Sequence, residues 1–391
     1  MSSENITSVV DWLIAGARSA PDAHVVLGEL CERLCACGLP LWRVEVFVRT
    51  LHPDVVGRRF RWQADHGVAV SSTPFSPPDS TETRESLIER VCADGLPIRR
   101  QLFRDNCAVD FPLLRELRDE GVTDFWATPL VFTDGDIHAA IWTSREPRGF
   151  TDKEVAAIEA IVTPLARVAE VRALRRTAVN LLETYVGSRA GERILAGQIR
   201  RGHTEAIQAA IWLSDMRGFT GLSDRVSPRV MIDILNRYFD CQVPAILKHG
   251  GEVLKFMGDG LLAMFPIQEE GETEKVCSDA LAAGLEARTR IREINSTGIE
   301  TFKDIRFGLA LHVGEVLYGN IGGGNRLDFT CIGPAVNLSA RLEKIAAKLG
   351  RTVVTSDAFA KHFGSELTPL GEFTVRGLGG QQMVFGLTDE N

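Results

Sequence analysis

The sequence predicts an α+β protein, and three observations lead to this class. The chain has 391 residues, enough for two or three domains at about 100–200 residues each. Hydrophobic residues make up 45% of it and charged residues 25%, so most of the chain has enough apolar material to bury a core. Strand-like and helix-like runs alternate over residues 206–387, with hairpin turns between some strands, which is typical of helices packed on an antiparallel sheet.

The charge balance and the apolar runs exclude several classes of protein. Lys and Arg number 44 and Asp and Glu 52, a net charge of −8, so we expect neither a nucleic-acid partner nor an anionic-membrane binder. No uninterrupted apolar stretch reaches the length of about 18 residues that a membrane span requires. Residues 1–5 lack the basic part of a signal peptide, and no apolar core follows, so we expect a cytoplasmic protein.

Residues 1–156 have the features of a mixed α/β region. Apolar residues at helical spacing predict a helix from about Asn5 to Cys37 with a break near Pro21. The predicted strands are residues 42–48, 124–130 and 138–143. Thr133-Asp134-Gly135-Asp136 predicts a hairpin turn between the last two strands. Four tryptophans are expected in the core rather than around a pocket. They are Trp42, Trp62, Trp126 and Trp142.

A long helix is predicted from Thr151, which forms a capping box with Glu154. Apolar residues then recur in steps of three and four, a stripe long enough to pair with the same stripe of a second copy. The stripe consists of Ile158, Ile161, Leu165, Val168, Val171, Leu174, Ala178, Leu181 and Tyr185. The alternative is an ordinary amphipathic helix that packs on the first domain and ends at Pro164.

The C-terminal half is predicted to alternate strands and helices. The expected strands are residues 206–213, 252–255, 261–265, 305–313 and 352–355. The expected helices are residues 228–249, 274–293 and 337–349. Ser227 and Pro228 favour a helix start at this point, and Met257-Gly258-Asp259-Gly260 predicts a hairpin tip.

Two aspartates lie where predicted strands end. Asp215 ends an apolar strand, and Asp259 lies at the hairpin tip. Two carboxylates on adjacent strands can hold two Mg²⁺ ions about 3.5–4 Å apart, the separation suited to in-line phosphoryl displacement. The loop with Phe219, Thr220 and Gly221 offers backbone N–H groups that suit a polyphosphate. Taken singly, each aspartate is more readily explained as a turn residue.

A second cluster runs from Asp328 to Glu343. Asn337 and Arg341 are four residues apart at the start of a predicted helix and so share one face. An amide and a guanidinium on one face can orient a ribose and stabilise charge on a phosphate. The simpler interpretation is an N-capping Asn and a surface Arg.

Together, segments 211–220, 253–260 and 328–343 resemble the catalytic domain of class III nucleotidyl cyclases. The resemblance extends over about residues 200–387. It implies a ferredoxin-like catalytic core that works only as a dimer, with active sites at the subunit interface.

The resemblance implies roles residue by residue. Asp215 and Asp259 match the two metal-binding aspartates, and the carbonyl of Met216 would add a ligand, which implies two divalent cations, Mg²⁺ or Mn²⁺. Lys255 and Thr330 match the base-recognising pair, and their donor and acceptor fit adenine. Guanylyl cyclases of this family typically carry an acidic residue and a Cys there, so the match favours ATP.

The remaining matches concern the ribose and the phosphates. Asn337 and Arg341 match the residues that orient the ribose and stabilise the transition state. Arg351 lies where the metal-binding half contributes a further phosphate contact. Arg376 replaces the Lys that usually holds the terminal phosphates, which keeps the charge but changes the hydrogen-bond geometry.

The implied reaction is in-line attack of the ATP ribose 3′-hydroxyl on the α-phosphorus, giving 3′,5′-cyclic AMP and pyrophosphate. A homodimer would hold two equivalent sites. One protomer would supply the two aspartates, and its partner would supply Lys255, Thr330, Asn337, Arg341 and Arg376. A guanylyl cyclase and a non-catalytic nucleotide-binding regulator are the alternatives. A regulator would normally have lost a metal-binding or transition-state residue, and none is lost here.

The resemblance and the residue pattern divide the chain into three parts. Residues 1–160 resemble a GAF-type sensor domain, with a PAS-like sheet as the alternative, and the alternatives for its binding partner are a small molecule, a protein and a second copy of itself. The signature of cyclic-nucleotide-binding GAF domains is not visible there. Residues 161–203 are expected to be a helical dimerisation and transducer linker, and residues 204–391 the catalytic domain.

Overall fold

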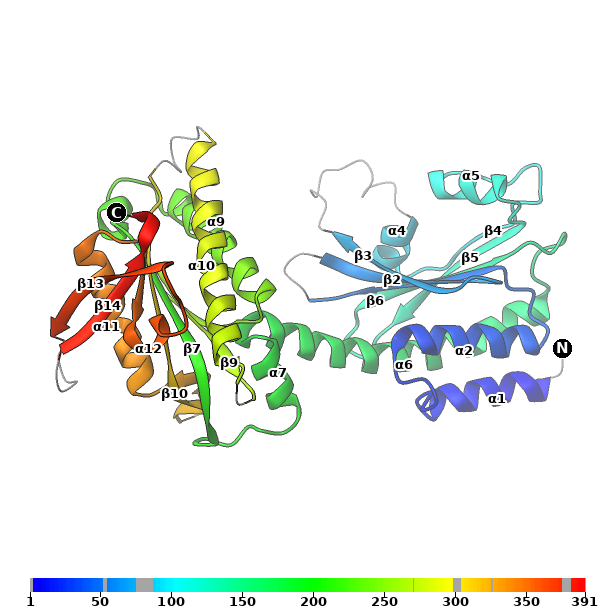
Figure 1. The fold of residues 1–391 in the computed structure, drawn as a ribbon. Coiled ribbons are helices and arrows are strands. Elements are labelled where there is room, and N and C mark those ends of the chain that lie inside the picture. The colour runs from blue at the N-terminus through cyan, green and yellow to red at the C-terminus, as the bar shows by residue number, and fades with distance from the viewer. Residues whose placement is uncertain are drawn as a thin grey trace. The chain divides into compact units, whose positions relative to one another are not determined.

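The structure, a computed structural model, describes residues 3–51, 55–74, 87–269, 271–297, 304–324, 326–374 and 381–390. Two units divide the chain, Met1–Leu181 and Leu182–Asn391, and each has its own β-sheet (Figure 1). Within these described ranges, no helix combines the length and the apolar character needed to cross a membrane.

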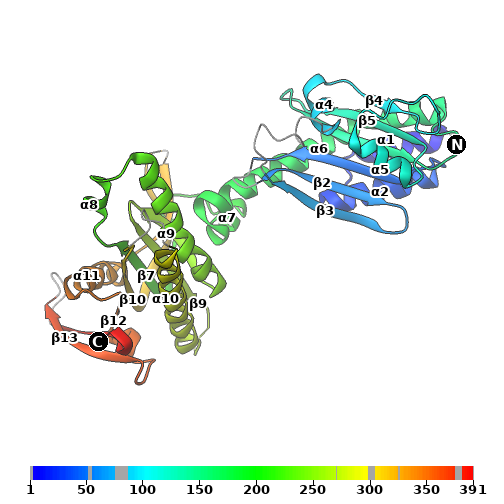
Figure 2. The ribbon, with the colours of Figure 1, turned by 90° about the horizontal axis from the view of Figure 1, so that it is seen from above.

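The first unit is a six-stranded antiparallel sheet with helices on both faces. Its strands lie in the order β3-β2-β1-β6-β5-β4, with β3 at one edge (Figure 2). The strands are β1 (Arg43–Arg49), β2 (Val55–Gln63), β3 (Gly67–Pro74), β4 (Ile98–Arg100), β5 (Asp124–Val131) and β6 (Ile137–Ser144). The helices are α1 (Ser3–Ile14), α2 (Ala23–Ala36), α4 (Leu87–Asp94), α5 (Pro112–Asp119) and α6 (Asp152–Val186). Helices α1, α2 and α6 lie on one side of this sheet, and α4 and α5 lie on the other (Figure 1).

Side chains of the first sheet alternate between two cores, as expected for a sheet covered on both faces. On β1, Val44, Val46 and Val48 pack with α2 and α6, whereas Phe47 packs with α4. The tryptophans lie in these cores, as predicted, with Trp42 only partly buried. The three buried ones are Trp62, Trp126 and Trp142.

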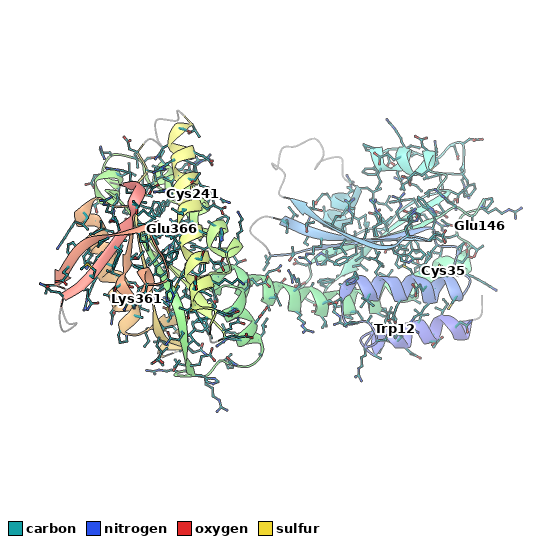
Figure 3. The ribbon with its side chains drawn as sticks, viewed as in Figure 1. Trp12, Cys35, Glu146, Cys241, Lys361 and Glu366 are labelled. Atoms are coloured by element: carbon teal, nitrogen blue, oxygen red, sulfur yellow. The ribbon has the colours of Figure 1, made fainter. Side chains whose placement is uncertain are left out.

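Local sequence signals located several elements of this unit correctly. The predicted helix over residues 5–37 is the pair α1 and α2, and Trp12 on α1 (Figure 3) donates from Nε1 to Ser19 Oγ at 3.0 Å in their connection. The capping box is confirmed, because the Thr151 N–H donates to Glu154 Oε2 at 2.7 Å and the Glu154 N–H to Thr151 Oγ1 at 3.4 Å.

The long helix α6 changes its buried face along its length. The members of the predicted apolar stripe up to Val168 are buried, and those from Val171 onward are exposed. Three consecutive three-residue steps separate Leu165 from Leu174, and each step turns the apolar face back by about 60°. The stripe therefore turns through roughly half a circle. The helix runs on through Pro164, so the alternative in which Pro164 ends it is wrong.

The second unit contains a larger, mixed sheet. Its strands are β7 (Thr204–Met216), β8 (Glu252–Met257), β9 (Gly260–Ile267), β10 (Phe307–Gly323), β11 (Arg326–Ile332), β12 (Val353–Ser356), β13 (Leu367–Thr374) and β14 (Gln381–Leu387). Its helices are α7 (Ser188–Leu195), α8 (Phe219–Ser223), α9 (Pro228–Lys248), α10 (Thr273–Ser296), α11 (Pro334–Leu349), α12 (Asp357–Ala360) and the 3₁₀ helix η2 (Thr388–Glu390).

The strand order of the second sheet is β13-β14-β12-β10-β7-β9-β8, with β11 paired to β10. Only the β10–β12 pair is parallel among the described strand pairs of this sheet. The succession β7-α9-β8-β9-α10-β10 is the β-α-β-β-α-β order of the ferredoxin-like fold, which confirms the expected class.

Helices cover both faces of this second sheet. On β7, Ala210 and Trp212 pack with α9 and α10, and Ile211 and Leu213 point to the opposite face. Helix α11 packs on β10 and β7. Asp215 follows Leu213 by two residues, so it lies on the same face as Leu213.

Candidate active site

Asp215 lies near the end of β7, between two glycines on the neighbouring strands. In the sheet register it pairs with Gly260 on β9 and with Gly308 on β10. A Cβ at Gly260 would lie 3.1 Å from Asp215 Oδ1. Because directly paired residues share a face of the sheet, the two glycines leave room around this half-buried carboxylate.

Asp259 lies at the tip of the β8–β9 hairpin, where the structure brings it to Asp215. The Met216 N–H donates to the Asp259 carbonyl oxygen at 3.3 Å, which ties the tip to the end of β7. Burial, and then the charges of Asp259 and Glu343, raise the pKa of Asp215 to about 6. A carboxylate whose ionised form is disfavoured by a neighbouring carboxylate favours a nearby cation, because the cation offsets the repulsion.

Arg217 directly follows the strand, and Glu343 on α11 holds its guanidinium. Arg217 Nη1 lies 2.6 Å from Glu343 Oε1, with side-chain exposures of 19% and 8%. The guanidinium lies over Gly308, where a Cβ would come 1.5 Å from Arg217 Nη2. The charge of Glu343 raises the pKa of Asp215 and that of Arg217 lowers it, so the two members of the ion pair act on Asp215 in opposite directions.

A buried chain of hydrogen bonds behind the carboxylates fixes β7 to α9. Trp212 Nε1 donates to Ser214 Oγ at 3.1 Å, and Ser214 Oγ donates to Gln242 Oε1 at 2.6 Å. Burial raises the pKa of the neighbouring Tyr238 hydroxyl. The sequence analysis missed this chain and the Arg217–Glu343 pair. The available signal was a serine and a glutamine at otherwise apolar positions of a strand and a helix.

The segment expected to contact polyphosphate follows the same strand. Gly218 has a φ of +74°, which a glycine adopts without strain, and it starts the short helix α8. Phe219 is half-buried against the core, and Thr220 and Gly221 are exposed. The first N–H groups of a helix have no partner within it, so this turn presents donors beside the carboxylate pair.

The two residues expected to read the base lie on neighbouring strands. Lys255 is half-buried on β8, and Thr330 is 4% exposed on β11, a strand that contacts β8. Lys255 is close enough to lower the pKa of Cys331, which burial raises to about 12. Thr330 Oγ1 is buried and has no hydrogen-bond partner among the described residues.

Asn337 and Arg341 lie on a different face of α11 from Glu343, the residue of this helix that acts on Asp215. Asn337 is exposed and Arg341 half-buried, whereas Glu343 is buried against Arg217. At about 100° per residue, Asn337 and Arg341 lie within roughly 40° of each other around the helix, and Glu343 lies on the opposite side. The face of α11 that meets Asp215 is therefore not the face that carries Asn337.

The last two predicted phosphate contacts differ in their surroundings. Arg351 follows α11 and donates from Nη1 to the carbonyl oxygen of Glu390. A phosphate contact through that nitrogen would require this bond to open. Arg376 lies outside the described residues.

The donor set fits a divalent cation that takes few protein ligands. Asp215 and Asp259 bring two carboxylates together, and Arg217 is engaged by Glu343 rather than by them. In the described part of the chain, no group of three or more His, Cys, Asp or Glu side chains could hold a metal ion. Mg²⁺ commonly uses one or two carboxylates and completes its shell with substrate phosphates and water.

Comparison with known proteins agrees with this fold. Residues 203–388 match the family model described as the adenylate and guanylate cyclase catalytic domain. Over these residues the chain is similar to the catalytic domain of class III nucleotide cyclases.

Curated relatives match the same region. Adenylate cyclase 1 of Rhizobium meliloti is 30% identical over 172 residues, which is 42% of this chain and 25% of that protein. Adenylate cyclase of Anabaena cylindrica is 29% identical over 169 residues, which is 42% of this chain and 32% of that protein. The match thus spans a third or less of either relative.

A solved structure of a bacterial light-regulated adenylyl cyclase shares the fold. It aligns with a TM-score of 0.50 and 18% identity, and covers 70% of this chain and 88% of that one.

Proposed function

We propose that this chain is an adenylyl cyclase that converts ATP to 3′,5′-cyclic AMP and pyrophosphate. The observation that carries the proposal is the contact between Asp215 and Asp259, brought together by the β7 end and the β8–β9 tip. The family match and the adenylate cyclases among the relatives support it.

In this proposal, Asp215, Asp259 and the Met216 carbonyl hold two divalent cations, Mg²⁺ or Mn²⁺. Such cations, when bound, lower the pKa of the ribose 3′-hydroxyl and neutralise phosphate charge. The turn at residues 219–221 and Arg351 contact the phosphates, and so does Arg376. Asn337 orients the ribose, and Arg341 stabilises the charge that develops on the α-phosphate during in-line attack.

Base selection would come from Lys255 and Thr330. A Lys ammonium can donate to N1 of adenine. It cannot accept from the N1–H of guanine, because both groups are donors. The Thr330 hydroxyl can accept from the 6-amino group, and its unpartnered oxygen in the described structure is available for this role. These two residues favour ATP over GTP.

The active site is proposed to be shared across a homodimer. Asn337 and Arg341 lie on the side of α11 opposite Glu343, so they turn away from the carboxylate pair of their own chain. A second copy would bring its Asn337 face to that pair. Each of the two sites would then use the aspartates of one protomer and the helix of its partner.

The N-terminal unit is proposed to be a GAF-like sensor, residues 1–160, that regulates the catalytic domain, residues 204–391, through the helical linker 161–203. Its antiparallel sheet with helices on both faces supports this. Deleting residues 1–180 should change basal or regulated activity. Unchanged activity on both counts would contradict a regulatory role.

Product analysis tests the proposed reaction. The purified full chain is incubated with ATP or GTP and with Mg²⁺ or Mn²⁺, and cyclic nucleotides are quantified. We expect cyclic AMP from ATP, and at least a hundredfold loss in Asp259→Ala with an unchanged circular dichroism spectrum. Faster cyclic GMP formation from GTP would indicate a guanylyl cyclase, and no product from either would indicate a nucleotide-binding regulator.

Mixing two inactive variants tests the shared site. Asp259→Ala and Asn337→Ala chains are each expected to be inactive alone. A mixed dimer restores one intact site out of two, so activity should return on mixing. If dimers form and no activity returns, the site is not shared.

A further inference from the structure

The first unit contains a cavity that the proposed cyclase reaction does not use. Its volume is about 590 Å³, within the range of small-molecule sites. It lies between the strands β1, β2 and β3 and the helices α2 and α6. All residues that line it belong to the first unit.

The walls of the cavity are mostly aliphatic. Val46 and Val48 on β1 lie on the face that also carries Phe60 of β2, because Val46 pairs directly with Phe60. Leu165 and Val168 close the opposite wall from α6. Among the described lining residues the aromatic rings are those of Phe60 and His24, and aliphatic side chains outnumber them, so the cavity suits an alkyl chain better than a flat ring.

Five arginines surround this apolar space, and Asp22 is the single carboxylate among the described lining residues. Arg172 donates to the carbonyl oxygens of Ala20 and Pro21, both at 2.8 Å, so its guanidinium is fixed at the start of α2. Arg175 makes no ion pair or hydrogen bond with a described residue. The other arginines are Arg49, whose Nη2 lies 2.7 Å from Glu89 Oε2, and Arg58 and Arg176, which also interact with other residues.

We propose that this cavity binds an amphipathic anion, namely an aliphatic acid whose chain fills the Val- and Leu-lined space while the arginines hold its headgroup. Arginine recognises carboxylate and phosphate oxygens through paired N–H donors, and both headgroups share this chemistry. Arg175, which has no hydrogen-bond or ion-pair partner among the described residues, is available to pair with such a headgroup. The proposal concerns binding alone and does not depend on the catalytic reaction.

Calorimetry on the full chain tests the proposal with decanoate, held below its micelle-forming concentration. We expect saturable binding of one decanoate per chain. Decyl phosphate should bind as well, and decanol should bind at least tenfold more weakly. Equal affinity for decanol would overturn the role of the arginines, and absence of saturable decanoate binding would overturn the site.

Two variants with matched controls locate the site. Arg175→Gln removes one charge and should weaken decanoate binding about tenfold, whereas Arg115→Gln on α5, on the other side of the sheet, should not. Ala169→Phe fills the cavity and should abolish binding, whereas Ala93→Phe at an exposed position of α4 should not. Binding unaffected by both cavity variants would place the acid elsewhere and refute the proposal.

Discussion

Arg217 Nη1 and Glu343 Oε1 lie 2.6 Å apart, so one ion pair fastens the loop after β7 to α11. The pair lies beside the two aspartates and keeps a guanidinium from closing on them. The cation site proposed for Asp215 and Asp259 would thus depend on a third carboxylate, that of Glu343, which lies outside it.

Glu343→Gln should weaken binding of Mn²⁺ about tenfold. The amide leaves Arg217 without a counter-charge, and the guanidinium then competes for Asp215. The free energy of unfolding should fall by about 1–3 kcal/mol, because a largely buried charge loses its partner. Calorimetric Mn²⁺ titration and urea denaturation measure the two effects. Glu366→Gln, at an exposed site (Figure 3), is the control. Unchanged Mn²⁺ affinity in Glu343→Gln would show that Arg217 does not compete.

Gly308→Ala should break the Arg217–Glu343 pair. The added Cβ would lie 1.5 Å from Arg217 Nη2, so the guanidinium has to leave its place. We expect a stability loss of about 1–3 kcal/mol, typical of overpacking, together with a large loss of cyclase turnover. Gly323→Ala on the same strand is the control, since no described atom lies within 4 Å of its added Cβ. Equal stability and turnover in the two variants would contradict this account.

Thr330→Val should stabilise the protein and impair substrate binding. Its Oγ1 is buried without a hydrogen-bond partner among the described residues, and removing such a group gains about 1 kcal/mol. Thr355 Oγ1 on β12 is unpartnered in the same sense, so Thr355→Val is the matched control. Both variants should unfold at higher urea concentration, and only Thr330→Val should raise the KM for ATP. A raised KM in both would remove the specific role of Thr330.

His312 should make stability depend on pH. Burial lowers the pKa of His312 to about 4, and its Nδ1 lies 2.7 Å from Ser356 Oγ. The unfolded chain, with a pKa of about 6.5, binds the proton more readily. The free energy of unfolding therefore has its full value, as far as His312 is concerned, above pH ~6.5. It decreases by up to about 3 kcal/mol as the pH falls toward 4, because the unfolded chain takes up the proton first.

The measurement is urea denaturation between pH 4.5 and 7.5, at about half-unit steps, for the wild type and for His312→Asn. The carboxylates titrate equally in both proteins and cancel in the difference. That difference should shrink as the pH falls. A difference that stays constant over the range would exclude His312 as the source.

Much of the second unit was predictable because its signals are local. The hairpin tip at Asp259 and the helix start at Ser227 follow from turn and capping residues a few positions apart, and Ser227 Oγ accepts from the Val230 N–H at 3.4 Å. Strand β10 extends ten residues beyond its predicted end because its glycines suggest a loop. Gly319 lies in the strand because only a residue without a side chain fits there. A Cβ at this position would lie 2.2 Å from the His203 carbonyl oxygen.

The first unit was harder to predict, because polar residues on its strands form ion pairs with residues that are distant in the sequence. Strand β2 was not predicted, since arginines interrupt its apolar pattern. Two of them, Arg59 and Arg61, lie near Glu45 of β1, the latter at 2.7 Å. In the candidate site, Asp215 and Asp259 were singled out from the sequence, and the structure brings them together. The Arg217–Glu343 pair was not, because it depends on how α11 packs across the sheet.

Because the apolar face of α6 turns between Leu165 and Leu174, this stretch should tolerate substitutions better than deletions. A substitution between Leu165 and Leu174 alters one contact. Deletion of one residue between Leu165 and Arg172 would rotate every later side chain of α6 by about 100° relative to the part before it. Arg172 would then lose its alignment with the Ala20 and Pro21 carbonyls. Evolutionary drift in this stretch should therefore proceed by point replacement, with its length held constant.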